Sequence, residues 1–549
     1  MTQNSVQEEA AQETRRAQQP PGGGDDGSPA ADTADTADAQ GELRRGRRRA
    51  PRRHRVLRWS ATTLAVLIVT TAGAGYLYYR HLNGNIEKGE RSSGDSKATK
   101  TAANSAGQTP LNILLIGSDS RASDENVALG GSRENRGNPP LGDVQMLIHL
   151  SADRESAAVV SIPRDTRVDI PKCRDPETGA KYAADNDIIN ESLAHGGAGC
   201  TLATWQNLTG VYIDHWMTID FAGVVQMADA VGGVEVCVNQ NVHDRPLPGV
   251  PGGSGLKLTQ GPHKIKGEDA LRWLRTRHAF GSDIQRAKAQ HMYMSSMIRE
   301  LRDQNVFKDT GRLMDLAEAA TDSLAVSEEI GTVKKLYDLG MELKSVPPNR
   351  ITMMTMPWAE DPENRNHVVP DGANADKVWE MLRDDVPFDK NGSGKPSARK
   401  PKEVLSSDPA APDGEIGVLV QNATRSESLG VVNGRANELT QALVAKGFAR
   451  AASDTSGSYA EERTVVRYPS AELEGDAQRV AKSLGIPLSS VKKSAEVSGV
   501  TLVVGGDWRT GTAYPKQTPP KAGDLPENSD ALNGADSSKC MDVYKPYRF

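Results

Sequence analysis

The chain has 549 residues, enough for three or four domains at about 150 residues each. Hydrophobic residues make up 37% and aromatic residues 5%, beside 52 glycines and 31 prolines, so a single dense core cannot run through the whole length. The net charge of −6 argues against a general nucleic-acid-binding protein. Compact units separated by linkers are therefore expected.

The N-terminal residues 1–58 are polar and end in an arginine-rich run. Residues 1–43 contain almost no large apolar side chains, so they cannot bury enough surface to offset the entropy of ordering, and we predict a disordered tail. Nine arginines then fall within residues 44–58. Such a run is typical of a solvated tail, of a nucleic-acid-binding arm or of the flank of a membrane helix, and the following residues favour the last.

Residues 59–79 form an uncharged segment of 21 residues, which as a helix spans about 31 Å, the thickness of a bilayer's hydrocarbon core. Trp59 and Tyr79 stand at its two ends, where interfacial aromatic residues are expected. Because the arginines precede it, the N-terminus is predicted to be cytoplasmic and residues 80–549 extracellular, in a single-pass protein of the cell membrane. A cleaved signal peptide is the alternative, since Ala72-Gly73-Ala74 resembles a cleavage site.

All four cysteines fall in the predicted extracellular part, where disulfides persist. Cys173 and Cys200 enclose the shortest loop among the internal cysteines, which would leave Cys237 to pair with Cys540. Buried free thiols are the alternative.

Polar segments divide the extracellular part into two globular units. Residues 80–110 and 389–414 are predicted linkers, and residues 511–549 a polar C-terminal tail. The units between them are residues 111–388 and 415–510.

The larger unit alternates short apolar runs with helical patterns, which predicts an α/β fold with α/β/α layers. The smaller unit, 415–510, follows the same alternation and is predicted to be a second α/β domain without an evident cluster of chemical groups. In the larger unit the predicted strands are 112–117, 144–150, 157–162, 215–220, 234–238 and 351–356, and the predicted helices are 201–208, 221–230, 267–274, 283–303, 309–324 and 328–343.

Two aspartates stand at the ends of predicted strands. Asp119 follows the first strand and Asp143 precedes the second. Ligands of α/β sheets bind beyond the carboxyl ends of strands, and two carboxylates beside phosphate oxygens suit Mg²⁺. The alternative is a pair of ordinary turn aspartates. P-loop, HExxH and GxSxG motifs are absent, and Gly252–Gly255 is interpreted as a flexible turn.

Arginines follow the same pattern. Arg164 comes directly after Pro163, which ends the third strand, and its alternative role is an ion pair with a neighbouring aspartate. Arg275 and Arg277 would point about 200° apart on a helix but share a face on an extended chain, so binding one phosphate requires the helix to end near Trp273. Solvated surface arginines are the alternative.

Arg286 and Gln290 lie four residues apart on the helix predicted at 283–303, away from its apolar stripe. The sequence Ser282–Gln285 fits a capping box at the start of this helix. Guanidinium groups match phosphate oxygens bidentately, so several arginines and one metal around one centre would suit a pyrophosphate.

These motifs resemble those of the LytR–CpsA–Psr (LCP) family of cell-envelope glycopolymer transferases. The matching strings lie within residues 111–300 and include NILLIGSDSR, GDVQMLIHL, AAVVSIPRDTRVDIP, GEDALRWLRTRH and SDIQRAKAQ. Residues 415–510 resemble the LytR C-terminal domain, from Val420-Gln421-Asn422-Ala423 to Val504-Gly505-Gly506-Asp507.

The resemblance implies a phosphotransferase that moves a glycopolymer from a polyprenyl-pyrophosphate carrier to peptidoglycan outside the membrane, with pyrophosphate cleavage and Mg²⁺ (or Mn²⁺) as cofactor. Its implied partners are the lipid-linked glycopolymer, peptidoglycan and the bacterial membrane, and no nucleic acid. The matching metal ligands are Asp119 and Asp143; these two and Arg164 match the catalytic residues; Arg121, Arg164, Arg275, Arg277, Arg286 and Gln290 match the substrate-binding residues.

The chain departs from the family pattern at three places. Ile188 stands where the family often has Lys, Ala289 stands where it has Arg, with Lys288 as a partial replacement, and Leu141-Gly142 precede Asp143 in place of the usual polar lead-in. These departures motivate a second hypothesis, a non-catalytic envelope protein that binds lipid pyrophosphate or wall polymer. A membrane-tethered transcriptional attenuator is a third, prompted by the arginine run. Deletion of residues 415–549 is expected to leave the pyrophosphate chemistry measurable.

Overall fold

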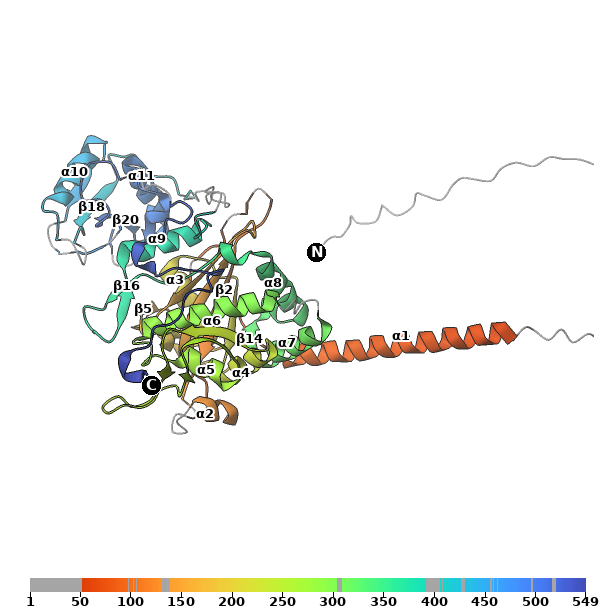
Figure 1. Cartoon of the computed structure of the whole chain (residues 1–549). Coiled ribbons are helices and arrows are strands. Elements are labelled where there is room, and N and C mark those ends of the chain that lie inside the picture. The colour runs from red at the N-terminus through yellow and green to blue at the C-terminus, as the bar shows by residue number, and fades with distance from the viewer. Residues whose placement is uncertain are drawn as a thin grey trace, which may run out of the picture. The chain divides into compact units, whose positions relative to one another are not determined.

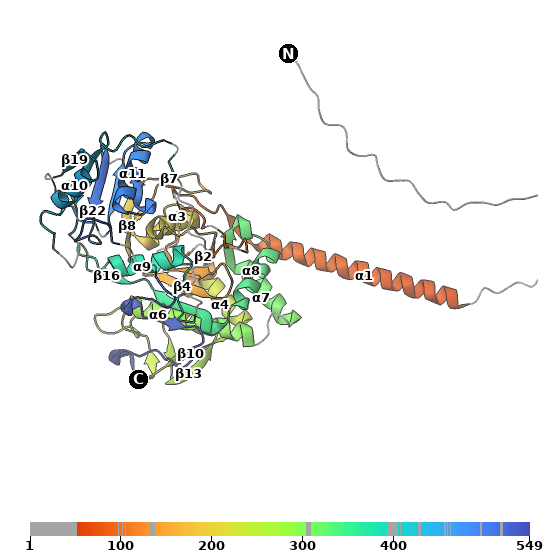
Figure 2. The ribbon, with the colours of Figure 1, turned by 90° about the horizontal axis from the view of Figure 1, so that it is seen from above.

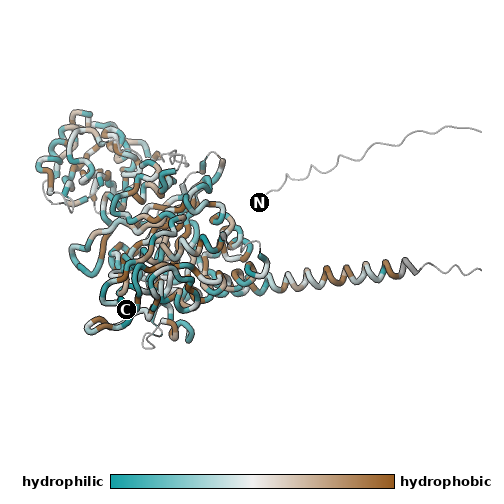
Figure 3. Tube along the Cα trace, in the orientation of Figure 1, coloured by the Kyte–Doolittle hydropathy of each residue, from teal (hydrophilic) through white to brown (hydrophobic). Residues whose placement is uncertain are grey.

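The computed structural model describes residues 52–549, with gaps at 97, 102, 105, 122, 131–135, 137, 304–308, 392–404, 407, 426–429, 455–456, 458, 462, 495–496 and 516–519. The predicted tail, residues 1–51, lies outside this range. Helix α1 (Arg52–Asn85) contains the predicted membrane segment. Within the described part of the chain, the one helix long and apolar enough to cross a membrane is Val56–Asn85. Figure 3 shows apolar residues along its middle.

The larger unit is built on a mixed eight-stranded sheet. Its central strands β2, β3 and β4 are antiparallel to one another, while β9 runs parallel to β2 and β15 parallel to β4. In spatial order the strands are β1 (Glu87–Gly89), β14 (Leu324–Ser327), β9 (His215–Ile219), β2 (Leu111–Ser118), β3 (Gly142–Leu150), β4 (Ala157–Ile162), β15 (Ile351–Thr355) and β23 (Leu532–Asn533).

Helices cover both faces of this sheet, and short paired strands edge it (Figure 1). The helices are α2 (Asp124–Gly130), α3 (Gly197–Thr209), α4 (Phe221–Ala230), α5 (Glu268–Arg275), α6 (Asp283–Asp303), α7 (Thr310–Ser323), α8 (Val333–Ser345) and α9 (Gly372–Arg383). The short pairs are β5 (Arg167–Ile170) with β8 (Asp185–Ile188), β6 (Cys173–Arg174) with β7 (Lys181–Tyr182), β10 (Val234–Val238) with β13 (Gly261–Ile265), β11 (Val242–His243) with β12 (Lys257–Leu258), and β16 (Trp358–Glu360) with β17 (Val368–Pro370).

The alternation of side chains along β2 places one core on each face of the sheet. Leu114 and Ile116 pack with α3 and α9, where Trp205 and Trp379 are fully buried. The other face, which includes Met146 of β3, packs against α4, α5 and α6. Figure 2 shows α3 and α9 on one side of β2 and β4, and α6 on the other. The predicted α/β/α layering is confirmed, and the predicted strands that became β2, β3 and β4 are placed to within two residues.

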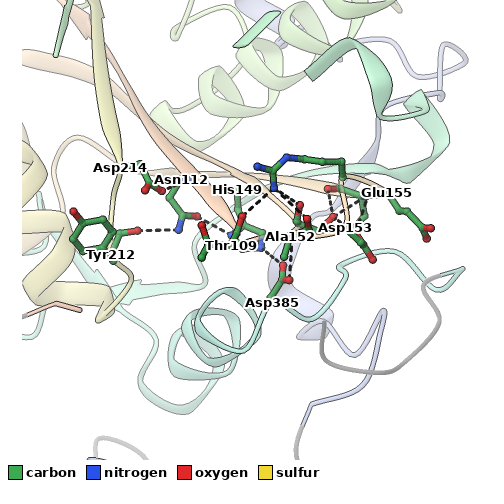
Figure 4. A network of polar contacts seen from close by, with 12 residues as sticks. Thr109, Asn112, His149, Ala152, Asp153, Glu155, Tyr212, Asp214 and Asp385 are labelled. Atoms are coloured by element: carbon green, nitrogen blue, oxygen red, sulfur yellow. Dashed lines mark hydrogen bonds and ion pairs between the residues drawn. The ribbon is translucent and has the colours of Figure 1, made fainter. Parts of the chain in front are cut away.

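A polar network closes one end of the sheet, where β2 begins and β3 ends (Figure 4). His149 Nδ1 lies 2.7 Å from Asn112 Oδ1, and His149 Nε2 lies 3.0 Å from Asp385 Oδ1. The second oxygen of Asp385 accepts from the backbone N–H of Ala152, and Asp214 accepts from that of Asn112. Both nitrogens of the buried His149 therefore have partners.

Residues 80–110, which their composition describes as a linker, contact the domain. They include β1, which pairs in parallel with β14. The guanidinium of Arg91 donates to the carbonyl of Ile213, and Lys100 Nζ lies 2.6 Å from Asp214 Oδ1. Polar side chains thus pair along the body, a pattern that mean polarity does not reveal.

Two disulfides join the four cysteines. Cys173 pairs with Cys200 across 27 residues, and Cys237 pairs with Cys540 across 303 residues. The expected pairing is confirmed. The second bond ties β10 to the segment 511–549, which from its composition alone is a polar tail and which also supplies strand β23.

The smaller unit contains a five-stranded sheet and two α-helices. A cluster of buried residues that includes Val420, Leu439 and Phe448 forms its own core. Arg435 is fully buried and donates through Nε to the carbonyl of Trp508, which fixes the start of α10. In spatial order the strands are β19 (Arg450–Ser453), β18 (Gly417–Asn422), β22 (Val500–Val504), β20 (Val465–Tyr468) and β21 (Val491–Lys493), with helices α10 (Arg435–Ala445) and α11 (Glu474–Leu484).

Candidate functional site

A cavity of about 410 Å³ opens at the end of the sheet opposite the polar network. Strands β2 and β4 end there and β3 begins there, as their antiparallel pairing requires. Every site residue predicted from the sequence lines this one cavity: Asp119, Arg121, Asp143, Arg164, Arg275, Arg277, Arg286 and Gln290.

The two predicted acids are held by backbone and by arginine. Asp119 follows β2, and its Oδ1 accepts from the N–H of Leu141 at 2.7 Å. Its other oxygen lies 3.6 Å from a guanidinium nitrogen of Arg121. Asp143 Oδ1 lies 3.1 Å from Arg164 NH1. Each carboxylate therefore faces the cavity beside a guanidinium group.

Asp283 is a further acid in this cluster, which sequence reasoning treated only as part of a helix cap. Its Oδ1 lies 2.9 Å from Arg286 NH2 and 3.8 Å from Arg164 Nε, and its Oδ2 lies 3.9 Å from Arg277 NH1. One carboxylate thus faces three guanidinium groups. The signal in the sequence is its spacing, three residues before Arg286 and six after Arg277.

The surroundings of the arginines move their pKa values in different directions. Burial lowers the pKa of Arg286 and of Arg275. Burial alone would also lower the pKa of Arg164, but the neighbouring carboxylates, Asp143 first, outweigh it and the pKa is raised. Guanidinium groups stay protonated at neutral pH in all these cases. The cavity is therefore lined with fixed positive charge.

The two arginines of the Arg275-Thr276-Arg277 motif reach the cavity because α5 ends between them. The helix ends at Arg275, and Thr276 is extended with φ −69° and ψ 112°. The end falls two residues after the predicted Trp273 but has the predicted effect. Arg275 donates to the carbonyls of Leu129 and Gly130 at 2.8 and 3.2 Å. These bonds fix its position at the cavity wall.

Helix α6 supplies Arg286 and Gln290. The N–H of Gln285 donates to Ser282 Oγ at 3.2 Å, which confirms the predicted cap. Gln290 is buried, and its Nε2 donates to the carbonyl of Leu274 at 3.0 Å. This bond joins α6 to the end of α5, so that the two helices present their arginines together.

A glycine-rich loop forms another wall, where sequence reasoning expected only a flexible turn. Pro251, Gly252, Gly253 and Ser254 line the cavity. The buried Asp244 accepts from the N–H of Ser254 at 2.7 Å. Gly253 has φ +127°, and a Cβ there would lie 2.9 Å from the carbonyl oxygen of Asp244. Only glycine fits this close approach without strain.

The sequence departures lie outside the cavity lining. Lys288, expected as a partial replacement for the missing arginine, is directed elsewhere: its Nζ lies 3.2 Å from Asp530 Oδ2. That expectation is wrong, because residues 288 and 290 lie on different faces of α6. Ala289 is fully buried, and its carbonyl accepts from Trp273 Nε1. Ile188 pairs with Arg167 in a strand ladder.

The residues of the cavity fit a bound phosphate group. Arg121 Nε and Arg164 Nε are buried without a hydrogen-bond partner, which is costly unless a ligand supplies an acceptor. Asp119 and Asp143 would suit Mg²⁺ only together with phosphate or water oxygens. Among the described residues no group of three or more His, Cys, Asp or Glu side chains could hold a metal without such help.

Comparison with known proteins gives two family matches. Residues 76–384 match the LytR_cpsA_psr family, and residues 415–508 match the family described as LytR cell envelope-related transcriptional attenuator. The cell wall biosynthesis protein LcpA of Corynebacterium glutamicum is 27% identical over 489 residues, covering 84% of this chain and 88% of that protein.

More distant matches share the larger unit. The polyisoprenyl-teichoic acid–peptidoglycan teichoic acid transferase TagU of Enterococcus faecalis is 24% identical over 274 residues, covering 50% of this chain and 79% of its own. Among solved structures, Bacillus subtilis TagV is 23% identical with a TM-score of 0.38 and covers 51% of this chain and 97% of its own.

Proposed function

Because the chain belongs to the LytR_cpsA_psr family, we propose that it is a phosphotransferase that attaches a glycopolymer from a polyprenyl-pyrophosphate carrier to peptidoglycan. The observation that carries the proposal is the convergence of five arginines and two strand-end aspartates on one cavity. A relative named as a teichoic acid–peptidoglycan transferase supports the same reaction class.

The proposed reaction exchanges one phosphorus–oxygen bond for another. The acceptor hydroxyl oxygen attacks the sugar-side phosphorus and forms a new P–O bond. The bond from this phosphorus to the bridging oxygen breaks, and polyprenyl phosphate leaves with that electron pair. The hydroxyl proton passes to a carboxylate or to water; Asp119 and Asp143 are the cavity carboxylates at the ends of β2 and β3 that could accept it.

The guanidinium groups would bind the pyrophosphate and stabilise the negative charge that grows on the leaving oxygens. Arg164 and Arg286 come from different elements and share the carboxylate of Asp283. That carboxylate holds the two guanidinium groups apart from each other's charge before the substrate arrives. Arg275, fixed on two backbone carbonyls, needs little reorganisation on binding.

Asp119 and Asp143 would hold the divalent metal that the proposal includes, Mg²⁺ or Mn²⁺, as its protein ligands. When bound, such an ion neutralises charge on the phosphate oxygens. The arginines beside the two acids would then turn fully to the substrate.

The apolar helix Val56–Asn85 supports a single-pass anchor. With the arginines before the span, the proposed topology has a cytoplasmic N-terminus and extracellular domains. The two disulfides support the same side, since disulfides persist outside the cytoplasm. The lipid carrier and peptidoglycan are both reached from that side.

The test uses the full chain in detergent micelles with a polyprenyl-pyrophosphate-linked sugar, and measures release of polyprenyl phosphate. Two arginines of α5 form a matched pair. Arg275 lines the cavity, whereas Arg272 is exposed and pairs with Glu268 and Asp269. Arg275→Ala is expected to lower turnover by about 10²-fold or more, and Arg272→Ala by less than about twofold.

Metal dependence is measured in the same assay by chelation and by Asp119→Asn. Release lost in both, and restored to the wild-type protein by Mg²⁺, would support the proposed metal ligands. Tight binding of the lipid without release in the wild-type protein, at any metal concentration, would instead establish the non-catalytic holder of lipid pyrophosphate. That second function is favoured by one observation, the buried Ala289 in place of the usual arginine.

A further inference from the structure

Neither family match covers residues 509–549. We call residues 525–549 the C-terminal strap. Its strand β23 pairs antiparallel with β15 at the edge of the central sheet. Leu532, Met541, Val543 and Tyr547 are buried in the same core cluster as Trp273 and Phe280 of the arginine region. The strap is therefore part of the larger unit's core, although the sequence places it after the smaller unit.

The strap is bonded along the elements that carry the site. The carbonyl of Gly534 accepts from Ser295 Oγ and from the Arg299 guanidinium, both on α6, at 2.9 Å each. Beyond the Cys237–Cys540 disulfide, the backbones of Met541 and β10 exchange two hydrogen bonds of 2.9 Å. The strap thus reaches the site from a chemically fixed anchor.

Its final residues contact the turn that follows Arg277. The N–H of Tyr544 donates to the carbonyl of Ala279 at 2.7 Å. The ring of Tyr547 stacks on His278, with 6.3 Å between ring centroids and 22° between planes. His278 lines the cavity, and its Nε2 accepts from Arg277 Nε at 3.3 Å.

The same turn is held from the other side by Asp244. Its Oδ1 accepts from the N–H of Ala279 at 3.2 Å, and its Oδ2 accepts from the N–H of Ser254 in the glycine-rich wall. Contacts therefore run from the strap, through Ala279 and Asp244, to two walls of the cavity.

From these contacts we infer that the C-terminal strap completes the catalytic domain and that Tyr547 is a positioning residue, which holds His278 and, through it, the guanidinium of Arg277. The part of this inference that concerns turnover rests on the proposed function. The smaller unit, 415–508, is then an insertion between two parts of one catalytic domain. Deletion of 415–549 removes β23, Cys540 and Tyr547 together, so the expectation that this deletion spares the chemistry is withdrawn.

The experiment uses single substitutions in the full chain. Tyr547→Leu keeps buried apolar volume and removes the aromatic stack, while Tyr547→Phe keeps both. Tyr544→Ala is the matched control, because its ring is 59% exposed and Tyr544 contacts Ala279 only through its backbone. Cys540→Ser releases the anchor without changing either tyrosine.

The first readout is amide hydrogen exchange of residues 276–281, which needs no substrate. Tyr547→Leu and Cys540→Ser are expected to speed exchange there by about tenfold, with α3 and α9 unchanged, because the turn loses its support while the opposite face of the sheet keeps its core. Tyr547→Phe and Tyr544→Ala are expected to match the wild type. Unchanged exchange in Tyr547→Leu, or equal acceleration in Tyr544→Ala, overturns the inference.

The second readout is lipid turnover. Tyr547→Leu is expected to lower kcat/KM by about tenfold or more through misplacement of the Arg277 turn, with rescue by Tyr547→Phe. A Tyr547→Leu protein with faster exchange and normal turnover overturns the positioning role. If the wild-type protein has no turnover, the proposed function fails, and the exchange experiment still decides whether the strap holds the turn.

Discussion

The two ends of β2 and β3 hold polar side chains in opposite ways. At the end marked by His149, each buried polar atom of the histidine has a partner, and Asp385 accepts from both His149 and Ala152. At the cavity end, buried nitrogens of Arg121 and Arg164 have no hydrogen-bond partner. A satisfied network stabilises the fold, whereas groups left without partners are poised for a ligand at a cost in stability. We therefore expect substitutions at the first end to change stability and substitutions at the second end to change activity.

The largest expected effect is at the cavity end. Arg286→Ala should lower turnover by about 10²- to 10³-fold, equivalent to roughly 3–4 kcal/mol, because a fixed positive charge beside the transferred phosphate is lost. Its thermal unfolding temperature should stay within about 2 °C of the wild type, since removal of a buried like charge offsets the lost packing. Kinetics and calorimetry on the same sample check both.

Arg302 is the control for this prediction on the same helix. Its guanidinium donates to the carbonyl of Val346 at 2.7 Å, so it joins α6 to the chain beyond α8. Arg302→Ala should lower stability and leave turnover per folded molecule unchanged. If Arg286→Ala lost stability to the same extent as Arg302→Ala, the contrast between the two ends would be broken.

The second prediction concerns the closed end. Asp385→Ala should lower the free energy of unfolding by about 2–3 kcal/mol, because His149 Nε2 and the N–H of Ala152 both lose their acceptor in a buried site. Asp385→Asn retains one oxygen and should lose less. Denaturant titration measures the stability, and turnover corrected for the folded fraction should remain within about twofold of the wild type. A specific loss of turnover would show that the closed end also serves the site.

A pair of buried histidines sharpens the comparison further. Unlike His149, His291 on α6 has an Nε2 without a partner, and burial lowers its pKa from 6.5 to about 4. The unfolded chain therefore binds more protons between those values, and stability falls as pH falls from about 6.5 towards 4. The loss from this group should be about 2 kcal/mol between pH 7.5 and 5. His291→Met should remove it, and an unchanged pH slope in that variant would exclude His291 as the source.

The smallest effect is expected at Lys288. Its ion pair with Asp530 is partly exposed, so Lys288→Ala should cost no more than about 0.5 kcal/mol of stability. Turnover should also change by less than about threefold, because Lys288 does not line the cavity. A loss comparable to that of Arg286→Ala would restore Lys288 as the replacement for the missing arginine.

Local pattern predicted most of the fold and the membership of the site. Strand runs such as 157–162 are apolar because both faces of the sheet are covered, so their limits were correct. All eight candidate residues lie around one cavity because they follow or precede strands that meet at one end. The resemblance to the family supplied their grouping, and the structure supplied their contacts.

The residues that were missed depend on contacts between distant segments. Asp283 looked like a cap residue because its three arginine partners come from separate parts of the chain. Asp244 gave no signal, since its acceptor role requires backbone N–H groups at Ser254 and Ala279. The strap was described as a tail because its polar composition conceals four buried apolar residues, including Met541 and Tyr547.

The long Cys237–Cys540 link sets an order on biosynthesis. During export Cys173 and Cys200, separated by 27 residues, can meet as soon as both have emerged. Cys237 then waits for more than half the chain before its partner arrives, 303 residues later. Early closure of the local pair leaves the late cysteines only each other as partners. A nascent chain interrupted before residue 525 would thus lack the strap, so the exported protein would acquire its complete catalytic domain only near the end of translocation.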